Sequence, residues 1–369
     1  MVDNNESADV RPLGPFAPLI ERTPLPVELG AMCDLQPIQG ALGSVWLLLN
    51  DRRELLRLDA TTGECVSVAN ANLDDEPERP PWNNRTARRR LHVSARGDFA
   101  AVVNDYGRFG QVLDLGSGRL TMTLDGGDYH PETVPFSLAF AELLGKTVLI
   151  HRTSWNRLDI SDPRTGELLT ERGPTSYESG QERPAHYLDF FHGGLHVSPG
   201  SKRLLDDGWI WQPVVMLAAW SIEPWLLENR WESEDGATKL DIAARDDWDC
   251  AATWLDDHRL AICGIGEESD EMIAGARIFD VSTAGAPGPN WHDHGRWARE
   301  LMAFPGPSGK FFSDGTWLFS SDANGLSRWD PATGALAGRL PGYEPSCFHP
   351  GACEFGQLGE HALLRVGLR

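Results

Sequence analysis

One phrase recurs six times along the 369-residue chain: a few apolar residues, an Asp or Ser, and a short turn that often ends in Thr-Gly or Ser-Gly. The marker residues of the six copies are Asp59, Asp114, Asp159, Ser221, Asp280 and Asp330. Successive markers are 45 to 62 residues apart. A strand-turn-strand signature repeated every ~50 residues is typical of a β-propeller blade, and it constrains the architecture far more than the function.

A second signal lies upstream of several markers, where one strand ends in a turn rich in Ser, Pro and Gly and the next strand begins. We find it at residues 91–99, 195–204 and 302–311. In the marker phrase, the Asp or Ser can accept hydrogen bonds from turn amides, and the Gly supplies a positive φ. We therefore place each marker between the third and fourth strand of a blade. The two signals together predict an all-β, seven-bladed propeller.

The predicted blades one to six cover about residues 35–71, 90–124, 135–172, 194–229, 250–287 and 301–340. The remaining C-terminal segment, 347–369, offers only two strands. We expect residues 15–29 to complete blade seven and so close the ring, because closure hides the edges of the terminal strands. Residues 1–14 are predicted to be a disordered tail, and residues 15–369 a single propeller domain.

Four predicted inter-blade segments are unusually long: 72–89, 173–191, 230–249 and 286–300. Long segments in a compact fold are usually functional or mobile. They are therefore where the sequence directs the search for a site.

The composition of the chain indicates which classes of partner it can bind and in which compartment it is found. The net charge of −21 argues against broad contact with nucleic acid or with an anionic membrane. The first ten residues are polar and acidic, unlike a signal peptide, and no apolar run is long enough to span a bilayer. Six scattered cysteines without CxxC spacing are expected to be reduced and mostly buried. These features predict a cytoplasmic protein.

The segment 286–300 contains the first candidate surface: Trp291, His292, His294, Arg296 and Trp297. In an extended strand, the two histidines would lie on one face and could bind a metal or an anionic ligand. Aromatic residues and arginine are also enriched at protein interfaces. The interface interpretation is favoured over the ligand site, since a surface pair of histidines is usually adventitious.

Arg85, Arg88 and Arg89, followed by Arg90, form a basic run in this acidic chain. Guanidinium groups could bind a phosphate or an acidic partner through paired hydrogen bonds. Acidic residues at 74–78 lie just upstream, so local ion pairing is the simpler interpretation. The first three arginines complete the candidate interaction surface.

Other clusters favour structural roles. His186, Asp189, His192 and His196 have a spacing that a metal could use, but His196 occupies the position of His92 in another copy of the repeat. Trp209 and Trp211 alternate along a strand, as expected for packing between blades. The acidic run at 267–271 lacks the order of a calcium loop. The sequence also contains no nucleotide-binding, serine-hydrolase or zinc-protease motif, so no cofactor is predicted.

With these signals in place, the chain resembles the WD-repeat and quinoprotein-like propellers. The pairs Trp329-Asp330 and Trp220-Ser221 are similar to the dipeptide that ends a WD-repeat blade. The stretch 204–211 is similar to one in uncharacterised bacterial propellers, which implies a cytosolic bacterial protein and no particular activity.

We therefore predict a monomeric interaction scaffold whose inter-blade loops and one ring face bind another protein, with no nucleic acid and no membrane. Propellers serve many functions, so the fold alone selects none of them. The alternative is an enzyme or a small-molecule sensor with a polar site at the mouth of the central channel. A convergent set of carboxylates and histidines there would favour that alternative.

Overall fold

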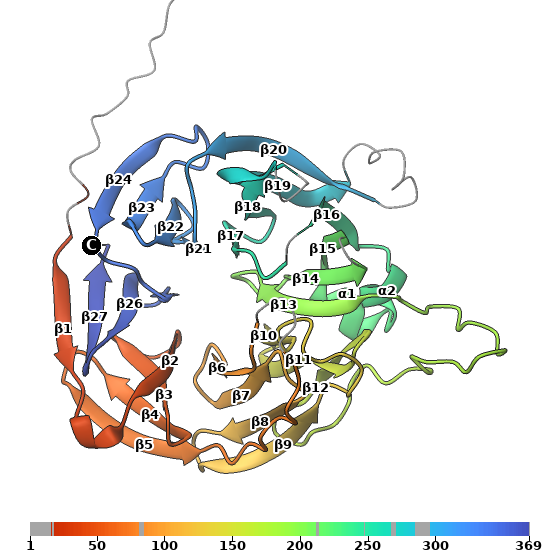
Figure 1. Ribbon diagram of the computed structural model, residues 1–369, viewed down its shortest axis with the longest axis horizontal. Helices are drawn as coiled ribbons and strands as arrows, with labels where there is room; N and C mark the ends of the chain where they lie inside the picture. Colours follow the sequence, from red (N-terminus) through yellow and green to blue (C-terminus); the bar gives the residue numbers. More distant parts are fainter. Residues whose placement is uncertain are drawn as a thin grey trace, which may run out of the picture.

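The computed structural model describes residues 16, 18–80, 85–211, 214–246, 248–266, 271–284 and 296–368. Its strands form seven antiparallel sheets arranged in a ring (Figure 1). The seven-bladed β-propeller predicted from the repeat is therefore confirmed. No helix in the described part of the chain is both long and apolar enough to cross a bilayer.

Four of the blades are regular four-stranded sheets. Blade one contains β2 (Met32–Pro37), β3 (Val45–Asn50), β4 (Glu54–Asp59) and β5 (Glu64–Asn70). Blade two contains β6 (Arg88–Val93), β7 (Phe99–Asp105), β8 (Phe109–Asp114) and β9 (Arg119–Asp125). Blade five contains β17 (Ala252–Trp254), β18 (Arg259–Ile265), β19 (Ile273–Ala284) and β20 (Ala298–Pro305). Blade six contains β21 (Lys310–Ser313), β22 (Leu318–Asp322), β23 (Gly325–Trp329) and β24 (Leu336–Pro341).

The marker phrase lies where the sequence predicts it, at the turn from the third to the fourth strand. Asp59 ends β4, and one of its carboxylate oxygens accepts the backbone N–H groups of Thr61 (2.9 Å) and Thr62 (3.1 Å). Gly63 closes the turn with φ of 79°, a conformation that glycine adopts without steric cost. The repeated phrase is therefore a turn signal that fixes the register of the outer hairpin.

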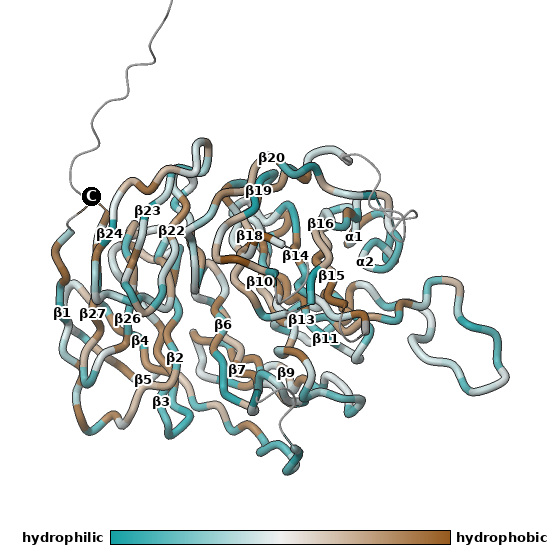
Figure 2. The backbone as a smooth tube through the Cα atoms, turned by 45° about the horizontal axis from the view of Figure 1, so that its top comes forward, coloured by the Kyte–Doolittle hydropathy of each residue, from teal (hydrophilic) through white to brown (hydrophobic). Residues whose placement is uncertain are grey.

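The core lies between neighbouring blades. All six residues of β3 are buried, and its side chains pack with those of β7 in a shared apolar cluster that includes Leu47, Leu91 and Val102. Removing such side chains from water is the main favourable term in folding. The connection 173–187 projects away from the ring (Figure 1), and its outer part is hydrophilic (Figure 2).

Blade seven is built from both ends of the described chain. It contains β25 (Cys347–His349), β26 (Glu354–Gly359) and β27 (Ala362–Gly367), completed by β1 (Ile20–Pro24). The β1–β27 register runs from Ile20 opposite Val366 to Pro24 opposite Ala362. This confirms the predicted ring closure. The following residues Val27–Leu29 form a short 3-10 helix, η1.

Blade three has three strands instead of the predicted four: β10 (Leu138–Leu143), β11 (Lys146–Ser154) and β12 (Arg157–Ser161). The segment 168–172 runs beside β12 and bonds to its outer edge. Leu169 donates its backbone N–H to the carbonyl of Ile160 (2.8 Å), and the Ile160 N–H donates to the hydroxyl of Thr170 (2.9 Å). A side-chain acceptor and a single β-bridge thus replace a full strand ladder.

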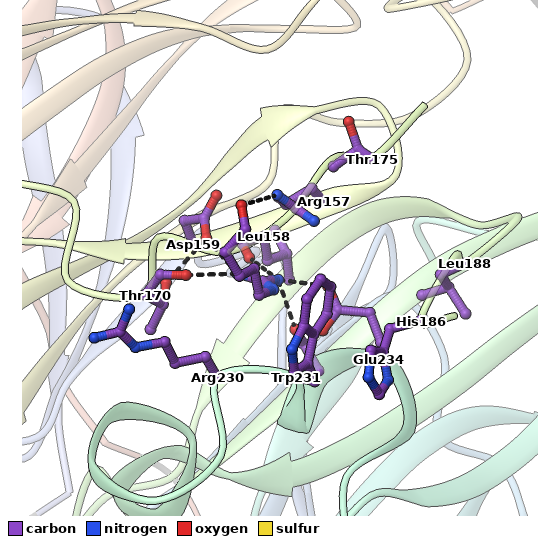
Figure 3. A network of polar contacts seen from close by, with 12 residues as sticks. Arg157, Leu158, Asp159, Thr170, Thr175, His186, Leu188, Arg230, Trp231 and Glu234 are labelled. Atoms are coloured by element: carbon purple, nitrogen blue, oxygen red, sulfur yellow. Dashed lines mark hydrogen bonds and ion pairs between the residues drawn. The ribbon is translucent and has the colours of Figure 1, made fainter. Parts of the chain in front are cut away.

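Arg172 fixes this substitute edge. Its partners Leu158, Asp159, Trp231 and Glu234 are labelled in Figure 3. Its buried guanidinium donates to the carbonyl of Leu158 (2.9 Å) and forms ion pairs with Asp159 and Glu234. The ring of Trp231 covers it, with 5.3 Å from the guanidinium carbon to the ring centroid. Glu234 comes from blade four, so the network also joins two blades.

Blade four requires a correction. Its strands are β13 (Phe191–Val197), β14 (Arg203–Trp211), β15 (Val214–Ser221) and β16 (Leu240–Arg245), and helices α1 (Ile222–Leu227) and α2 (Glu232–Asp235) stand between β15 and β16. The predicted loop 230–249 is wrong, because it contains α2 and β16. The helices separate the marker Ser221 from its fourth strand, which has buried apolar residues such as Leu240 and Ile242.

The boundary between blades five and six also differs from the prediction. The segment 286–300 belongs to blade five instead of lying between two blades, because it follows β19 and its last three residues are the start of β20. Residues 302–305 belong to β20, the fourth strand of blade five, so the third copy of the Ser-Pro-Gly signal marks an inter-blade turn. Both errors arise because the long insertion displaces the fourth strand from its marker, Asp280.

Candidate functional site

The central channel has two mouths. One lies where the fourth strand of a blade leads into the first strand of the next; we call it the inter-blade mouth. Its cavity has a volume of about 840 Å³, and charged residues at its wall include Arg88, Arg90, Asp207, Asp249 and Lys310. The opposite mouth has a cavity of about 1040 Å³ beside the turns between first and second strands.

The inter-blade mouth is built on β6, the innermost strand of blade two. Alternation along the strand places Arg88 and Arg90 on the same side. Arg90 pairs with the fully buried carboxylate of Asp105 (3.1 Å), which also accepts the backbone N–H of Phe136 (3.2 Å). The neighbouring carboxylate of Asp105 is the main reason that the pKa of Arg90 is raised. Asp105 therefore holds this strand to blade three.

A contact across the channel mouth joins blade two to the connection between blades four and five. Tyr106 donates its hydroxyl to the carboxylate of Asp249 (2.5 Å). Burial, and then the charge of Asp249, raises the pKa of Tyr106, so the hydroxyl keeps its proton. Both residues have a left-handed backbone, with φ of 58° and 55°. Such strained non-glycine residues gather at functional sites.

Arg85 reinforces that contact. Its guanidinium donates to the hydroxyl of Tyr106 (3.2 Å) and to the backbone carbonyl of Trp248 (3.0 Å). The guanidinium carbon also lies 4.9 Å from the centroid of the Trp248 ring, within the range of a cation–π interaction. Arg85 is thus committed to internal contacts, which hold the base of the mouth rigid.

Arg88 differs from its neighbours because its side chain is 60% exposed. Its closest carboxylates, those of Asp105 and Asp249, are 3.7 and 3.8 Å away. Both contacts are ion pairs whose N···O distances are longer than that of a hydrogen bond. Its guanidinium can therefore donate hydrogen bonds to a group that arrives from solution.

The two cavities meet at a narrow point lined by His92, Leu138, Leu195, His196 and Thr253. Burial lowers the pKa of His92 to about 3 and that of His196 to about 4, so both imidazoles are neutral at pH 7. Within the part of the chain that the structure describes, the buried Nε2 atom of His92 has no hydrogen-bond partner. The predicted equivalence of these two histidines in the repeat is confirmed.

The described residues of the predicted candidate surface lie in two parts of the ring. Arg85, Arg88 and Arg89 lie at the inter-blade mouth, where Arg89 pairs with Asp75 (3.7 Å) as local ion pairing predicts. Trp291, His292 and His294 lie outside the described residues. Arg296 is at the other end of β16, bonded to the backbone carbonyls of Gly236 and Ala237.

Trp297 follows Arg296 and forms a parallel β-bridge with Asp241. Its side chain packs beside a small buried cluster made of Phe190, Met216 and Ala244. The Arg296–Trp297 pair therefore lies at the start of β16 in blade four, whereas Arg88 and Arg89 lie in β6 of blade two.

The histidine cluster at 186–196 has three separate environments. His186 contacts Asp235 (2.8 Å), His192 is buried against Asp206 (2.6 Å), and His196 lies at the narrow point of the channel. Among the described residues, no three His, Cys, Asp or Glu side chains could hold a metal ion. The structural interpretation of these histidines fits their contacts.

Other predictions have mixed outcomes. Trp209 packs in the apolar cluster of blades four and five, as predicted, while the side chain of Trp211 and the acidic residues 267–270 lie outside the described part. All six cysteines are unpaired thiols, but only Cys347 is buried. The expectation of mostly buried cysteines is therefore wrong.

Asp105, Tyr106 and Asp249 are site residues that the sequence reasoning missed. One local signal was available, because Asn104 and Asp105 end the otherwise apolar strand that begins at Phe99, and Tyr106 follows it. No local signal connects Tyr106 to Asp249, since 143 residues separate them. Only the ring brings them together.

Solved structures share this architecture at low sequence identity. A chain from the crystal structure of the mitotic checkpoint complex matches 98% of this chain and 98% of its own length, with a TM-score of 0.56 and 12% identity. The β-propeller domain of Cps50 (Swd1) from Myceliophteria thermophila matches 92% of this chain and 97% of its own, with a TM-score of 0.53 and 10% identity.

At these identities the likeness shows the fold alone. No family model matches the sequence, and no curated protein matches it.

Proposed function

We propose that this propeller is an interaction scaffold that binds another protein at its inter-blade mouth, with Arg88 as the contact that anchors the partner. The observation that carries this proposal is an exposed guanidinium held above a rigid base of internally bonded residues. Arginine is among the residue types that dominate binding energy at protein interfaces. The partner presents a carboxylate to Arg88, because a carboxylate matches the planar donors of a guanidinium.

The base of the site supports a binding role more than a catalytic one. Three carboxylates at the base of the mouth have internal partners: Asp105 pairs with Arg90, Asp207 with Arg245 (3.0 Å), and Asp249 accepts from Tyr106. A general base needs a lone pair within reach of a substrate proton. These carboxylates instead position the surface from which Arg88 projects.

The test is an affinity purification of the tagged protein from its native host, followed by mass spectrometry at low and high salt. The wild type is compared with Arg88→Glu and with the control Arg119→Glu, an exposed arginine on the outer strand β9. We expect one stoichiometric partner with the wild type and with the control. Charge reversal at Arg88 should weaken binding at least about tenfold, roughly 1.4 kcal/mol.

Isolation of the propeller alone, or a partner that binds Arg88→Glu as tightly as wild type, would refute this function. A partner lost equally with Arg119→Glu would indicate nonspecific charge attraction, which also contradicts an anchor at Arg88. Circular dichroism of both variants checks that the fold is retained.

A small-molecule sensor is the second candidate. It is favoured by the neutral His92 and His196 at the narrow point of the channel, where one imidazole nitrogen lacks a partner within the described residues. Native mass spectrometry of the purified protein would show a bound ligand as added mass that is lost on denaturation. His92→Phe should abolish that mass if the ligand contacts the imidazole.

The remaining assignments stay predictions from the sequence. These are the cytoplasmic location, the monomeric state, the absence of nucleic-acid and membrane partners, the likeness to bacterial propellers, and the division into a tail at 1–14 and one domain at 15–369.

A further inference from the structure

Two cysteines that are 13 residues apart in sequence meet at the wall of the inter-blade mouth. Cys250 lies just before β17, and Cys263 lies in β18. Both line the cavity of about 840 Å³, and both are partly exposed. Neither has a role in the binding site proposed above.

The strand pairing brings the two residues close together. Cys263 donates its backbone N–H to the carbonyl of Ala251 (2.9 Å), so Cys250 is adjacent to the residue opposite Cys263. Neighbouring residues of a regular strand point to opposite faces, but Cys250 precedes β17, and it lines the same cavity as Cys263. The two thiols also interact, which raises the pKa of Cys250 and lowers that of Cys263. The Cys250 thiol has a second contact, with the carbonyl of Trp248 (3.8 Å).

The surroundings favour a thiolate on one of the two sulfurs. The hydrogen bond from Cys250 and the nearby guanidinium of Arg245 lower the pKa of Cys263 to about 7, although burial acts in the opposite direction. Arg245 is held in place by its pair with Asp207 (3.0 Å) and by a contact with the Cys263 carbonyl (3.4 Å). A thiolate is the reactive form of cysteine.

We propose that Cys250 and Cys263 form a reversible dithiol–disulfide site that is oxidised by hydrogen peroxide or a related hydroperoxide. The Cys263 thiolate attacks one peroxide oxygen; an S–O bond forms, the O–O bond breaks, and the departing hydroxide takes up the proton that Cys263 released on ionising and becomes water. Cys250 then attacks the sulfenyl sulfur; the S–S bond forms, and the S–O bond breaks. The proton of Cys250 converts the second hydroxide into water. Two thiols are thus oxidised as one peroxide is reduced to two waters.

Disulfide formation does not depend on whether a protein binds at Arg88. In a reducing compartment the pair would rest as thiols, as the structure shows them, and respond only to oxidant. The other four cysteines provide internal controls. Cys33 is an exposed residue, but the partial burial of its thiol and the charge of Asp51 raise the pKa of that thiol. Cys33 should therefore react more slowly than Cys263.

The experiment is a peroxide titration of the full chain, followed by alkylation, trypsin digestion and mass spectrometry. Trypsin cleaves after Arg245, Arg259 and Arg277, which places the two cysteines in different peptides, 246–259 and 260–277. We expect these peptides to become linked before Cys33 is modified, and to separate again with dithiothreitol. The rate should rise about tenfold between pH 6 and pH 8 as the thiolate fraction grows.

Single variants test the order of the two steps. In Cys250→Ser, Cys263 should accumulate as a sulfenic acid that dimedone traps. In Cys263→Ser, dimedone should leave Cys250 unlabelled at the same peroxide concentration. Oxidation of Cys33 or Cys353 while peptides 246–259 and 260–277 remain unlinked would overturn the proposed site, as would a link that dithiothreitol fails to reverse.

Discussion

Blades three and seven both lack a fourth strand from their own stretch of sequence, and the chain completes them in different ways. Blade seven receives β1 from the other end of the described chain, so its outer edge is satisfied by backbone pairing. Blade three receives the hydroxyl of Thr170 and the guanidinium of Arg172. The comparison shows that a propeller can satisfy a strand edge either with a ladder or with buried side chains.

The two solutions differ in what they depend on. A backbone ladder tolerates most side-chain changes, because the N–H and carbonyl groups remain whatever the residue. The edge of blade three depends on one cation that balances Asp159 and Glu234, all three with side chains at most 4% exposed. A buried ion is costly when its partner is removed. Blade three should therefore be sensitive to single substitutions, and blade seven to loss of a segment.

Deletion of residues 1–30 should have the largest effect, because it removes all of β1 and exposes the edge of β27. Five register pairs are lost, worth about 5 kcal/mol at roughly 1 kcal/mol each, and the open edge should promote aggregation. Differential scanning calorimetry and light scattering measure the two effects. Deletion of residues 1–14 is the matched control and should change neither. A normal melting temperature for the longer deletion would show that β1 does not close the ring.

Arg172→Met should destabilise the protein by about 3–5 kcal/mol, since it leaves two buried carboxylates without their cation. Urea unfolding followed by tryptophan fluorescence measures the change. Adding Asp159→Asn and Glu234→Gln should recover much of the lost stability, because the uncompensated charges are gone. The exposed Arg164 of the same blade gives the control, with less than about 0.5 kcal/mol expected for Arg164→Met. Equal losses for the two arginines would remove the distinction between the blades.

Arg365→Met applies the same change to blade seven and should cost less, about 1–2 kcal/mol. Arg365 pairs with Glu354 (3.0 Å) next to β1, but Glu354 keeps hydrogen bonds from the hydroxyl of Ser44 and the indole of Trp46. The β1–β27 ladder also remains intact. Urea unfolding of both variants gives the ratio of their losses in unfolding free energy. A larger loss for Arg365→Met than for Arg172→Met would reverse the comparison.

The prediction with the smallest effect at neutral pH concerns acid stability in blade three. Burial lowers the pKa of His151 to about 4, and its Nε2 atom is 2.9 Å from the hydroxyl of Ser161 on β12. In the unfolded chain His151 binds a proton near pH 6.5, and in the folded chain only near pH 4. Its contribution to stability is therefore fully present above about pH 6.5 and is lost as the pH drops toward 4. The contribution changes by at most about 1.4 kcal/mol per pH unit.

His151→Gln should therefore flatten the dependence of the unfolding free energy on pH between about 6 and 4.5. The exposed His258 supplies the control, and His258→Gln should leave the slope unchanged. Unfolding in urea at a series of pH values measures the slope. An unaltered slope in His151→Gln would mean that this histidine does not take up its proton on unfolding.

The parts of the fold that repeat could be predicted, because each blade carries its own turn signal. Asp59 and Gly63 specify a turn through bonds within five residues, so the pattern is visible in the sequence. The predicted range of blade four ends before its fourth strand, because helices α1 and α2 separate Ser221 from β16. Such an insertion changes the spacing without changing the marker.

The candidate site was less predictable, because its contacts join residues that are far apart in sequence. The run from Arg85 to Arg90 indicated a charged surface, but not that only some of its members would be internally bonded. Arg85 reaches Trp248, and Arg90 reaches Asp105. These partners are set by the curvature of the ring, and no local spacing encodes them.

The order of β1 and β27 along the chain has a consequence for synthesis in the cell. β1 is made about 340 residues before its partner. At roughly 5–20 residues per second, it waits on the order of 20–70 s for β27 to emerge. During that interval the growing protein is an open arc with two unsatisfied edges, so its exposure to chaperones and to misassembly is set by the time needed to translate the whole stretch between β1 and β27.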